Sequence, residues 1–233
     1  MDKIINKLDV VFEDNHLLII VKPPNILSQG DNTGDLSIVD LAKEYLREKY
    51  NKPGNVYLGL VHRLDRPVGG LMALAKTSKA AERLSLQLQK KEMRRSYLAV
   101  VEGKLKSQVL EEYIAQDKNG FMVKASSNDE NAKFAKLSVS SISEKSNLTL
   151  CRIDLDTGRK HQIRSQLSMA GYPIRYDMRY GNGSPGKQIA LWGAWLSLIH
   201  PISKERILFK SKPYSDSFNE FKEEIDSIFN EKL

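Results

Sequence analysis

The chain has 233 residues, of which 41% are hydrophobic and 28% are charged, a balance typical of globular proteins and unlike that of disordered segments. Lysine and arginine exceed aspartate and glutamate by 7, which favours polyanionic partners such as nucleic acid. No stretch approaches the roughly 18 apolar residues that span a bilayer, and residues 1–8 lack the apolar core of a signal segment. With Cys151 as its one cysteine, we expect a cytoplasmic protein that folds as a single domain over residues 1–233.

The first elements are expected to be a hairpin followed by a helix. The apolar segments Asp9–Glu13 and Leu17–Lys22 flank a short polar connection, and two prolines stop the second strand. Ser37 with Asp40 three residues later resembles a capping box, and apolar residues follow at helical spacing up to Tyr50. This helix is expected to cover one face of a sheet.

The rest of the chain is rich in strands that neighbour one another in the sequence. Residues 56–61 and 71–76 are expected to be strands on either side of a loop, followed by a helix capped by Ser78. The further strands expected are residues 97–102, 109–116, 121–125, 137–142, 148–155, 189–199 and 206–210, with helices at 160–170 and 217–229. Strands that pair with their neighbours form antiparallel sheets. The fold class expected is therefore α+β, with a mixed, largely antiparallel central sheet flanked by a few helices.

The loop after residues 56–61 contains the first candidate site. It reads His62-Arg63-Leu64-Asp65-Arg66, with one acid between two arginines. Loops held by a rigid scaffold commonly carry catalytic residues. A surface loop with one structural ion pair would also place an acid between arginines. On these residues alone, that interpretation is favoured.

A second cluster of polar side chains lies at the start of the helix expected at residues 160–170. It reads Gly158-Arg159-Lys160-His161-Gln162-Ile163-Arg164. Backbone N–H groups and cationic side chains at a helix N-terminus suit a phosphate or a carboxylate. A basic helix face in solvent is the alternative, and by itself it is the simpler interpretation.

Five short motifs follow one another in order along nearly the entire chain. They are residues 13–18 with Lys22-Pro23, residues 62–66 with Gly70-Leu71 and residues 75–77, residues 97–103, Gly158-Arg159 with residues 161–164, and His200-Pro201. Their order and spacing resemble the RluA family of RNA pseudouridine synthases. The resemblance implies the pseudouridine synthase catalytic fold and an isomerase, an intramolecular transferase that acts on ribosomal or transfer RNA.

The resemblance also implies roles for single residues. Asp65 would be the catalytic carboxylate, Tyr97 the ring that packs on the target base, and Arg164 the partner of Asp65. Ile163 would form an apolar wall, and Arg63 would fill the space left by the extruded nucleotide. Uridine in structured RNA is stacked, so the enzyme must flip it out and hold it, for which an aromatic face is suited. The other substrate-binding residues expected are His62, Arg159, His161 and Gln162.

The implied reaction breaks the bond between ribose and uracil N1 and rejoins the detached base through C5. Nothing is added and no redox change occurs, so we expect neither a cofactor nor a metal. An ionised Asp65 can act as a nucleophile at the sugar or as a base toward a ribose proton. The sequence is compatible with both roles.

Three positions depart from the family's usual pattern. Val68-Gly69-Gly70 stands where many members have Thr-Ser-Gly, and Arg95 stands where lysine is usual. Tyr176-Asp177 stands where Gly-Asp is usual. If that glycine requires a positive φ, tyrosine is costly there and the loop differs in shape. These changes bear on substrate recognition more than on chemistry.

Many relatives carry a small amino-terminal S4-like RNA-binding domain, whereas here the catalytic pattern begins by residue 9. We therefore expect a stand-alone catalytic domain that contacts RNA with its own basic side chains. No heptad seam is evident, so a monomer without an obligate protein partner is expected. The candidates for RNA contact are Lys90, Lys91, Arg94, Arg95, Arg159, Lys160, Arg175 and Arg179.

Two other classes of function are compatible with parts of the sequence. One is an RNA-binding protein or chaperone that uses the same fold without catalysis. The other is a metal-dependent hydrolase built from His62, Asp65 and His161, which are side chains that metals accept. No His-x-x-x-His motif or acidic pair accompanies them, so structural histidines are the simpler interpretation.

Overall fold

The computed structural model describes residues 8–230 and groups the chain into two compact units. Unit 1 comprises Met1–Arg94 and Gly193–Ser211, and unit 2 comprises Arg95–Trp192 and Lys212–Leu233. The single domain expected from the sequence stays a prediction, and most of the segment expected to lack a signal, residues 1–7, lies outside the described residues. Within residues 8–230, no helix is long and apolar enough to cross a membrane.

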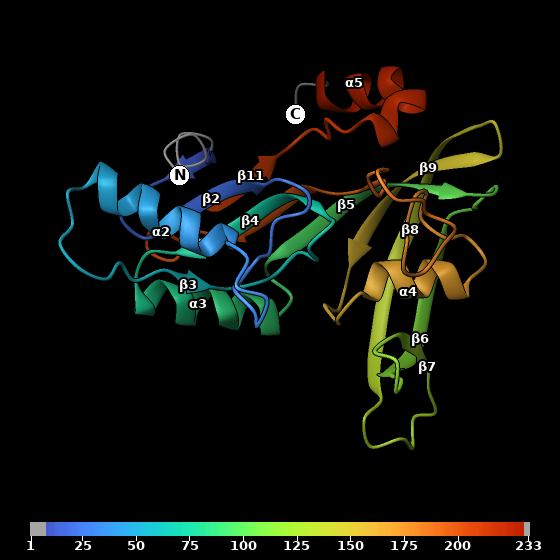
Figure 1. Cartoon of the computed structure of the whole chain (residues 1–233), viewed down its shortest axis with the longest axis horizontal. Coiled ribbons are helices and arrows are strands. Elements are labelled where there is room, and N and C mark those ends of the chain that lie inside the picture. Colours follow the sequence, from blue (N-terminus) through green and yellow to red (C-terminus); the bar gives the residue numbers. More distant parts are fainter. Residues whose placement is uncertain (1–7, 231–233) are drawn as a thin grey trace. The chain divides into compact units, whose positions relative to one another are not determined.

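The sheet of unit 1 has the strand order β1-β2-β4-β10, with β3 paired to β4 and β11 paired to β10. Strands β2, β3, β4 and β11 are labelled in Figure 1. Strands β1, β2 and β4 pair antiparallel, as do β10 and β11. The first two residues of β10 belong to unit 2 and the rest to unit 1. The strands are β1 (Asp9–Glu13), β2 (Leu17–Lys22), β3 (Gly59–Leu60), β4 (Gly69–Ala75), β10 (Leu191–Ile199) and β11 (Arg206–Lys210).

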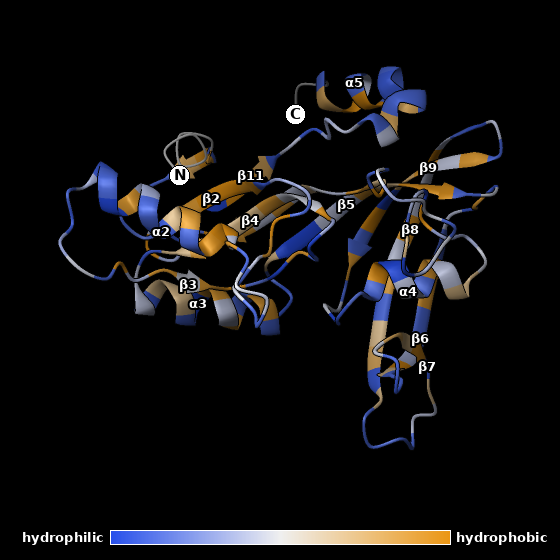
Figure 2. Cartoon of the chain, in the orientation of Figure 1, coloured by the Kyte–Doolittle hydropathy of each residue, from blue (hydrophilic) through white to orange (hydrophobic). Residues whose placement is uncertain are grey.

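Strands β2 and β4 form the centre of the core of unit 1. Every residue of both strands is buried, as expected for strands covered on both faces, and β2 is coloured as hydrophobic in Figure 2. Gly70 has a φ of +127°, and a Cβ there would collide with the backbone of Gly193. Glycine is therefore required at the point where the candidate catalytic loop enters β4.

The helices of unit 1 begin close to where the sequence predicts. The capping box of Ser37 and Asp40 is confirmed at the start of α2 (Ile38–Lys49). Helix α3 (Ser78–Gln89) is capped by Thr77, which corrects the predicted cap by one residue. The strand predicted at residues 56–61 is reduced to β3, because only Gly59–Leu60 pairs with β4.

Unit 2 contains an antiparallel sheet with the order β5-β9-β8-β6-β7. Helix α4 (Gln162–Met169) lies against it, since Gln166 donates to the carbonyls of Leu110 and Ala135. The strands are β5 (Arg94–Glu102), β6 (Gln108–Gln116), β7 (Met122–Lys124), β8 (Lys133–Lys145) and β9 (Leu148–Leu155). The predicted α+β class with a largely antiparallel sheet is confirmed.

The helix predicted at residues 217–229 is divided into two segments in the structure. The first turns form the 3-10 helix η1 (Asp216–Phe221), and α5 (Lys222–Asn230) follows. Phe218, Phe221 and Ile225 are buried, as the spacing of apolar residues predicts.

Candidate active site

Asp65 lies, half-buried, in the loop between β3 and β4 of unit 1. The backbone on both sides of Asp65 is bound to a second loop, residues 23–28. Ser28 Oγ donates to the carbonyl of Leu64 at 2.6 Å and accepts the N–H of the same residue at 3.1 Å. The N–H of Asn25 donates to the carbonyl of Arg66 at 2.7 Å. The candidate catalytic carboxylate is therefore held by a fixed stretch of backbone.

Lys22, the last residue of β2, is fully buried behind the same loop. Its Nζ donates to the carbonyls of Pro23 at 2.9 Å, Ile26 at 2.8 Å and Arg66 at 3.1 Å, which uses all three of its N–H groups. Burial lowers the pKa of Lys22 to about 7, although the negative charge of Asp65 acts in the opposite direction. Lys22 thus joins β2, residues 23–26 and the Asp65 loop, and its charge interacts with that of Asp65.

His62 and Arg63 precede Asp65 but have different environments. His62 is buried, and its Nε2 accepts the N–H of Ala73 in β4 at 3.0 Å, so this nitrogen carries no proton. The structure thus shows that His62 contacts the sheet, and its contact with substrate stays a prediction. Arg63 is exposed, and its contact with RNA stays a prediction.

Tyr97 and Ile163 are the two apolar residues that the sequence assigns to the target base. Both belong to unit 2, and they are 5% and 6% exposed. Tyr97 lies in β5 opposite Ile153 of β9, and Ile163 lies in the first turn of α4. Sheet and helix therefore fix both side chains, with only a small edge of each reaching the surface.

The turn before α4 is held by Gln162. Its Oε1 accepts the hydroxyl of Thr157 at 2.8 Å and the N–H of Arg159 at 2.9 Å. Its Nε2 donates to the carbonyl of Lys136 at 3.1 Å and to Gln166 Oε1 at 2.9 Å. These four bonds use the full capacity of the amide, so Gln162 braces the turn, and the substrate contact expected for it stays a prediction.

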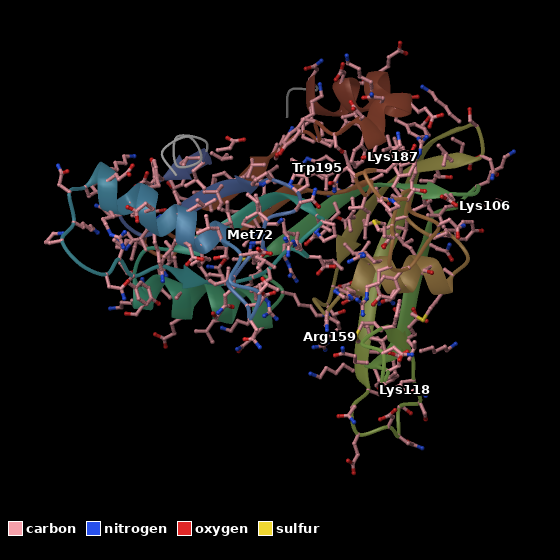
Figure 3. The ribbon with its side chains drawn as sticks, viewed as in Figure 1. Met72, Lys106, Lys118, Arg159, Lys187 and Trp195 are labelled. Atoms are coloured by element: carbon pink, nitrogen blue, oxygen red, sulfur yellow. The ribbon has the colours of Figure 1, made fainter. Side chains whose placement is uncertain are left out.

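Arg159 and His161 lie in this turn and precede the helix. The sequence predicts a helix from residue 160, but α4 begins at Gln162, after His161 in the left-handed region with φ of 50°. His161 Nδ1 forms a hydrogen bond of 2.9 Å with the hydroxyl of Tyr180. Arg159 is exposed, labelled in Figure 3, and its Nε donates to the carbonyl of Phe134 at 3.0 Å. The basic groups therefore come from an irregular turn, and the predicted helix placement is wrong for them.

Arg164 is bound by Asp177, a residue to which the sequence motifs give no role in the site. Arg164 Nε donates to Asp177 Oδ2 at 2.8 Å and Nη2 donates to Oδ1 at 2.7 Å. Asp177 is fully buried and also accepts the N–H groups of Arg179 and Tyr180. Burial alone would raise the pKa of Asp177, but the hydrogen bonds from Arg164 hold it below its ordinary value. A buried guanidinium needs a carboxylate to balance its charge, and this need indicates an acidic partner such as Asp177.

The residue before Asp177 has a positive φ, which is the conformation expected at a position where the family usually has glycine. Tyr176 has a φ of +63°, a region in which glycine is favoured. Its ring lies against the guanidinium of Arg175, 4.8 Å from ring centroid to Cζ. A Cβ on Gly183 would collide with the backbone of Tyr176 and Asp177, so the loop that holds Asp177 is closely packed.

The candidate residues are distributed over both units. Asp65, His62 and Arg63 belong to unit 1, whereas Tyr97, Arg164 and the residues of the turn belong to unit 2. The pairing of Asp65 with Arg164 stays a prediction. Within residues 8–230, no three His, Cys, Asp or Glu side chains are grouped as metal ligands would be, so no such cluster supports the hydrolase interpretation.

Comparison with known proteins identifies the family. The family model described as RNA pseudouridylate synthase matches residues 16–169. An uncharacterized RNA pseudouridine synthase of Bacillus subtilis is 32% identical over 217 residues, which cover 91% of this chain and 71% of the relative. Ribosomal large subunit pseudouridine synthase D of Nitrosomonas europaea is 32% identical over 216 residues, 88% of this chain and 61% of the relative.

The fold agrees with this match. The solved structure of human RNA Pseudouridylate Synthase Domain Containing 4 superposes with a TM-score of 0.78 over 94% of this chain and 95% of that one, at 21% sequence identity. At this identity the likeness concerns the fold alone. Together with the family match over most of the chain, it shows that the protein belongs to the RNA pseudouridylate synthase family, as an isomerase of the RluA type.

Proposed function

We propose that the protein converts specific uridines of structured RNA, ribosomal or transfer RNA, to pseudouridine, with Asp65 as the catalytic carboxylate. The observation that carries this proposal is the anchoring of the Asp65 loop. Lys22 and Ser28 hold the backbone on both sides of a half-buried carboxylate in the stretch that matches the family. The relatives named for the large ribosomal subunit favour ribosomal RNA as the first substrate to test.

The other site residues account for how the base is presented. The target uridine leaves the stack and lies against Tyr97, with Ile163 as an apolar wall, and Arg63 fills the gap in the RNA. The bond from C1′ to N1 breaks and the bond from C1′ to C5 forms, while the proton on C5 passes to solvent and N1 gains one. Asp65 acts as nucleophile at the sugar or as base toward a ribose proton, and both roles need its ionised form.

Arg164 is proposed as the partner of Asp65. Asp177 holds one edge of the guanidinium, so its orientation is set before RNA binds. A preorganised guanidinium can bind a carboxylate through two parallel hydrogen bonds, whereas a lysine offers a point charge on a flexible stem.

Pseudouridine maps of cellular RNA test the proposal. A strain that lacks the protein should lose one or more pseudouridines, and a plasmid copy of the wild type should restore them, whereas Asp65→Asn should not. A complete set of pseudouridines in the deletion strain would contradict catalysis and favour the RNA-binding protein without enzymatic activity. The position of the lost sites identifies the substrate as ribosomal or transfer RNA.

A further inference from the structure

Arg95 and Tyr97 lie on the same face of β5. Side chains two residues apart in a strand point to one side, separated by about 7 Å along the strand. This distance is comparable with that between a base and the phosphate of the same nucleotide. A base on Tyr97 would therefore bring its own or a neighbouring phosphate near Arg95.

The guanidinium of Arg95 lies end-on against Gly158, in the turn that precedes α4, with its two Nη atoms nearest to the glycine. A Cβ built on Gly158 would be 2.9 Å from both Nη1 and Nη2 of Arg95 and 3.3 Å from its Cζ. Gly158 does not have a positive φ, so the backbone conformation does not demand glycine. A Cβ at this position would therefore displace the guanidinium of Arg95 from its present place.

The charge of Arg95 is not balanced by a carboxylate within residues 8–230, and its buried Nε has no hydrogen-bond partner there. Arg152, on the opposite face of the same sheet, differs in this respect. It forms an ion pair with Asp154 at 3.1 Å and donates to the hydroxyl of Ser96. Residues opposite each other on paired strands share a face, and Arg152 is opposite Leu98, one residue from Tyr97.

We propose that Arg95, supported by Gly158, binds a phosphodiester of the RNA next to the nucleotide that stacks on Tyr97. The positive charge of a guanidinium attracts a phosphodiester, and its N–H groups donate to phosphate oxygens. Within residues 8–230 no carboxylate competes for the charge of Arg95. The proposal rests on the proposed function, because it assumes that the target base lies on Tyr97. In this proposal Gly158 leaves space for the guanidinium that binds the phosphodiester.

The test compares RNA binding of the full chain and its variants over a range of salt concentrations. With a short single-stranded oligouridylate as probe, Arg95→Gln should weaken binding about tenfold at low salt. It should also reduce the slope of log affinity against log salt by about 0.7, the value for one phosphate contact on a single strand. Arg95→Lys should retain the slope, since it keeps the charge.

Arg152→Gln and Gly30→Ala serve as matched controls, and Gly158→Ala is a second test of the proposal. Arg152→Gln removes one positive charge from the other face of the sheet and should leave the slope unchanged. Gly158→Ala should weaken binding in the same direction as Arg95→Gln. Gly30→Ala should have no effect, because the nearest atom to a Cβ there is 3.9 Å away.

The results that overturn the proposal are distinct from those that overturn the proposed function. If Arg95→Gln and Arg152→Gln change the salt slope equally, Arg95 is not a phosphate contact. If Gly158→Ala binds like the wild type, the supporting role of Gly158 is wrong. Wild-type turnover on cellular RNA, measured in parallel, tests the enzymatic function by itself. Turnover with an unchanged slope in Arg95→Gln would overturn only the present inference.

Discussion

Lys22 in unit 1 and Arg164 in unit 2 are both buried cations next to candidate site residues, but their charges are balanced in different ways. Lys22 is bound by three backbone carbonyls, and burial lowers its pKa to about 7. Arg164 is bound by the carboxylate of Asp177 through two hydrogen bonds and keeps its charge at any ordinary pH. The charge of Lys22 therefore changes near neutral pH, whereas the charge of Arg164 does not.

The largest effect is expected when the Arg164 and Asp177 pair is broken. Asp177→Ala leaves a buried guanidinium without this carboxylate, which should lower the free energy of unfolding by about 3 to 5 kcal/mol. Urea denaturation measures this loss. The double variant Asp177→Leu with Arg164→Met removes both charges and should recover much of the stability. A loss below about 1 kcal/mol in Asp177→Ala would show that the pair does not hold this region together.

Tyr97 carries no charge, so replacing it tests base stacking without changing the charges of Lys22 and Arg164. Tyr97→Ala should lower kcat/KM on structured RNA by a factor equivalent to about 1 to 3 kcal/mol, the usual scale for a base on an aromatic ring. Tyr97→Phe keeps the ring and should retain most of the activity. A normal rate in the alanine variant, with the fold verified by circular dichroism, would assign Tyr97 to the core only.

The pH dependence of Lys22 is expected to be of moderate size. With a pKa of about 7 when folded and 10.5 when unfolded, the unfolded chain binds more protons between these values, so stability rises with pH. Relative to Lys22→Met, the wild type should gain about 2 kcal/mol of unfolding free energy between pH 7 and pH 9. A difference that stays constant over this range would show that Lys22 keeps its proton.

The smallest effect concerns the loop that holds Asp177. Tyr176→Ala and Tyr176→Gly both remove the ring, but only glycine adopts the positive φ without cost. The glycine variant should therefore be more stable than the alanine variant by about 1 kcal/mol, as measured by urea denaturation. Equal stability of the two variants would mean that the loop relaxes to another conformation.

The sequence predicts the regular elements of this fold better than the details of its site. Strand β2 and the capping box of Ser37 depend on local spacing, so their positions follow from the residues themselves. Helix α4 begins later than predicted, and the turn before it is held in part by a long-range hydrogen bond from Gln162 to β8, which local spacing does not indicate. The carboxylate of Asp177 was not assigned for a similar reason, since no local pattern indicates which acid binds Arg164.

The central claim is that Asp65 is the catalytic carboxylate of a pseudouridine synthase, and tritium release tests it most directly. RNA labelled with tritium at C5 of uracil loses the label to water when the base is rejoined through C5. The purified wild type should release tritium from its substrate RNA, and Asp65→Asn should release none, while its affinity for RNA stays within about tenfold because the substitution is nearly isosteric. Release by Asp65→Asn at a substantial rate, with host enzyme excluded, would contradict the assignment.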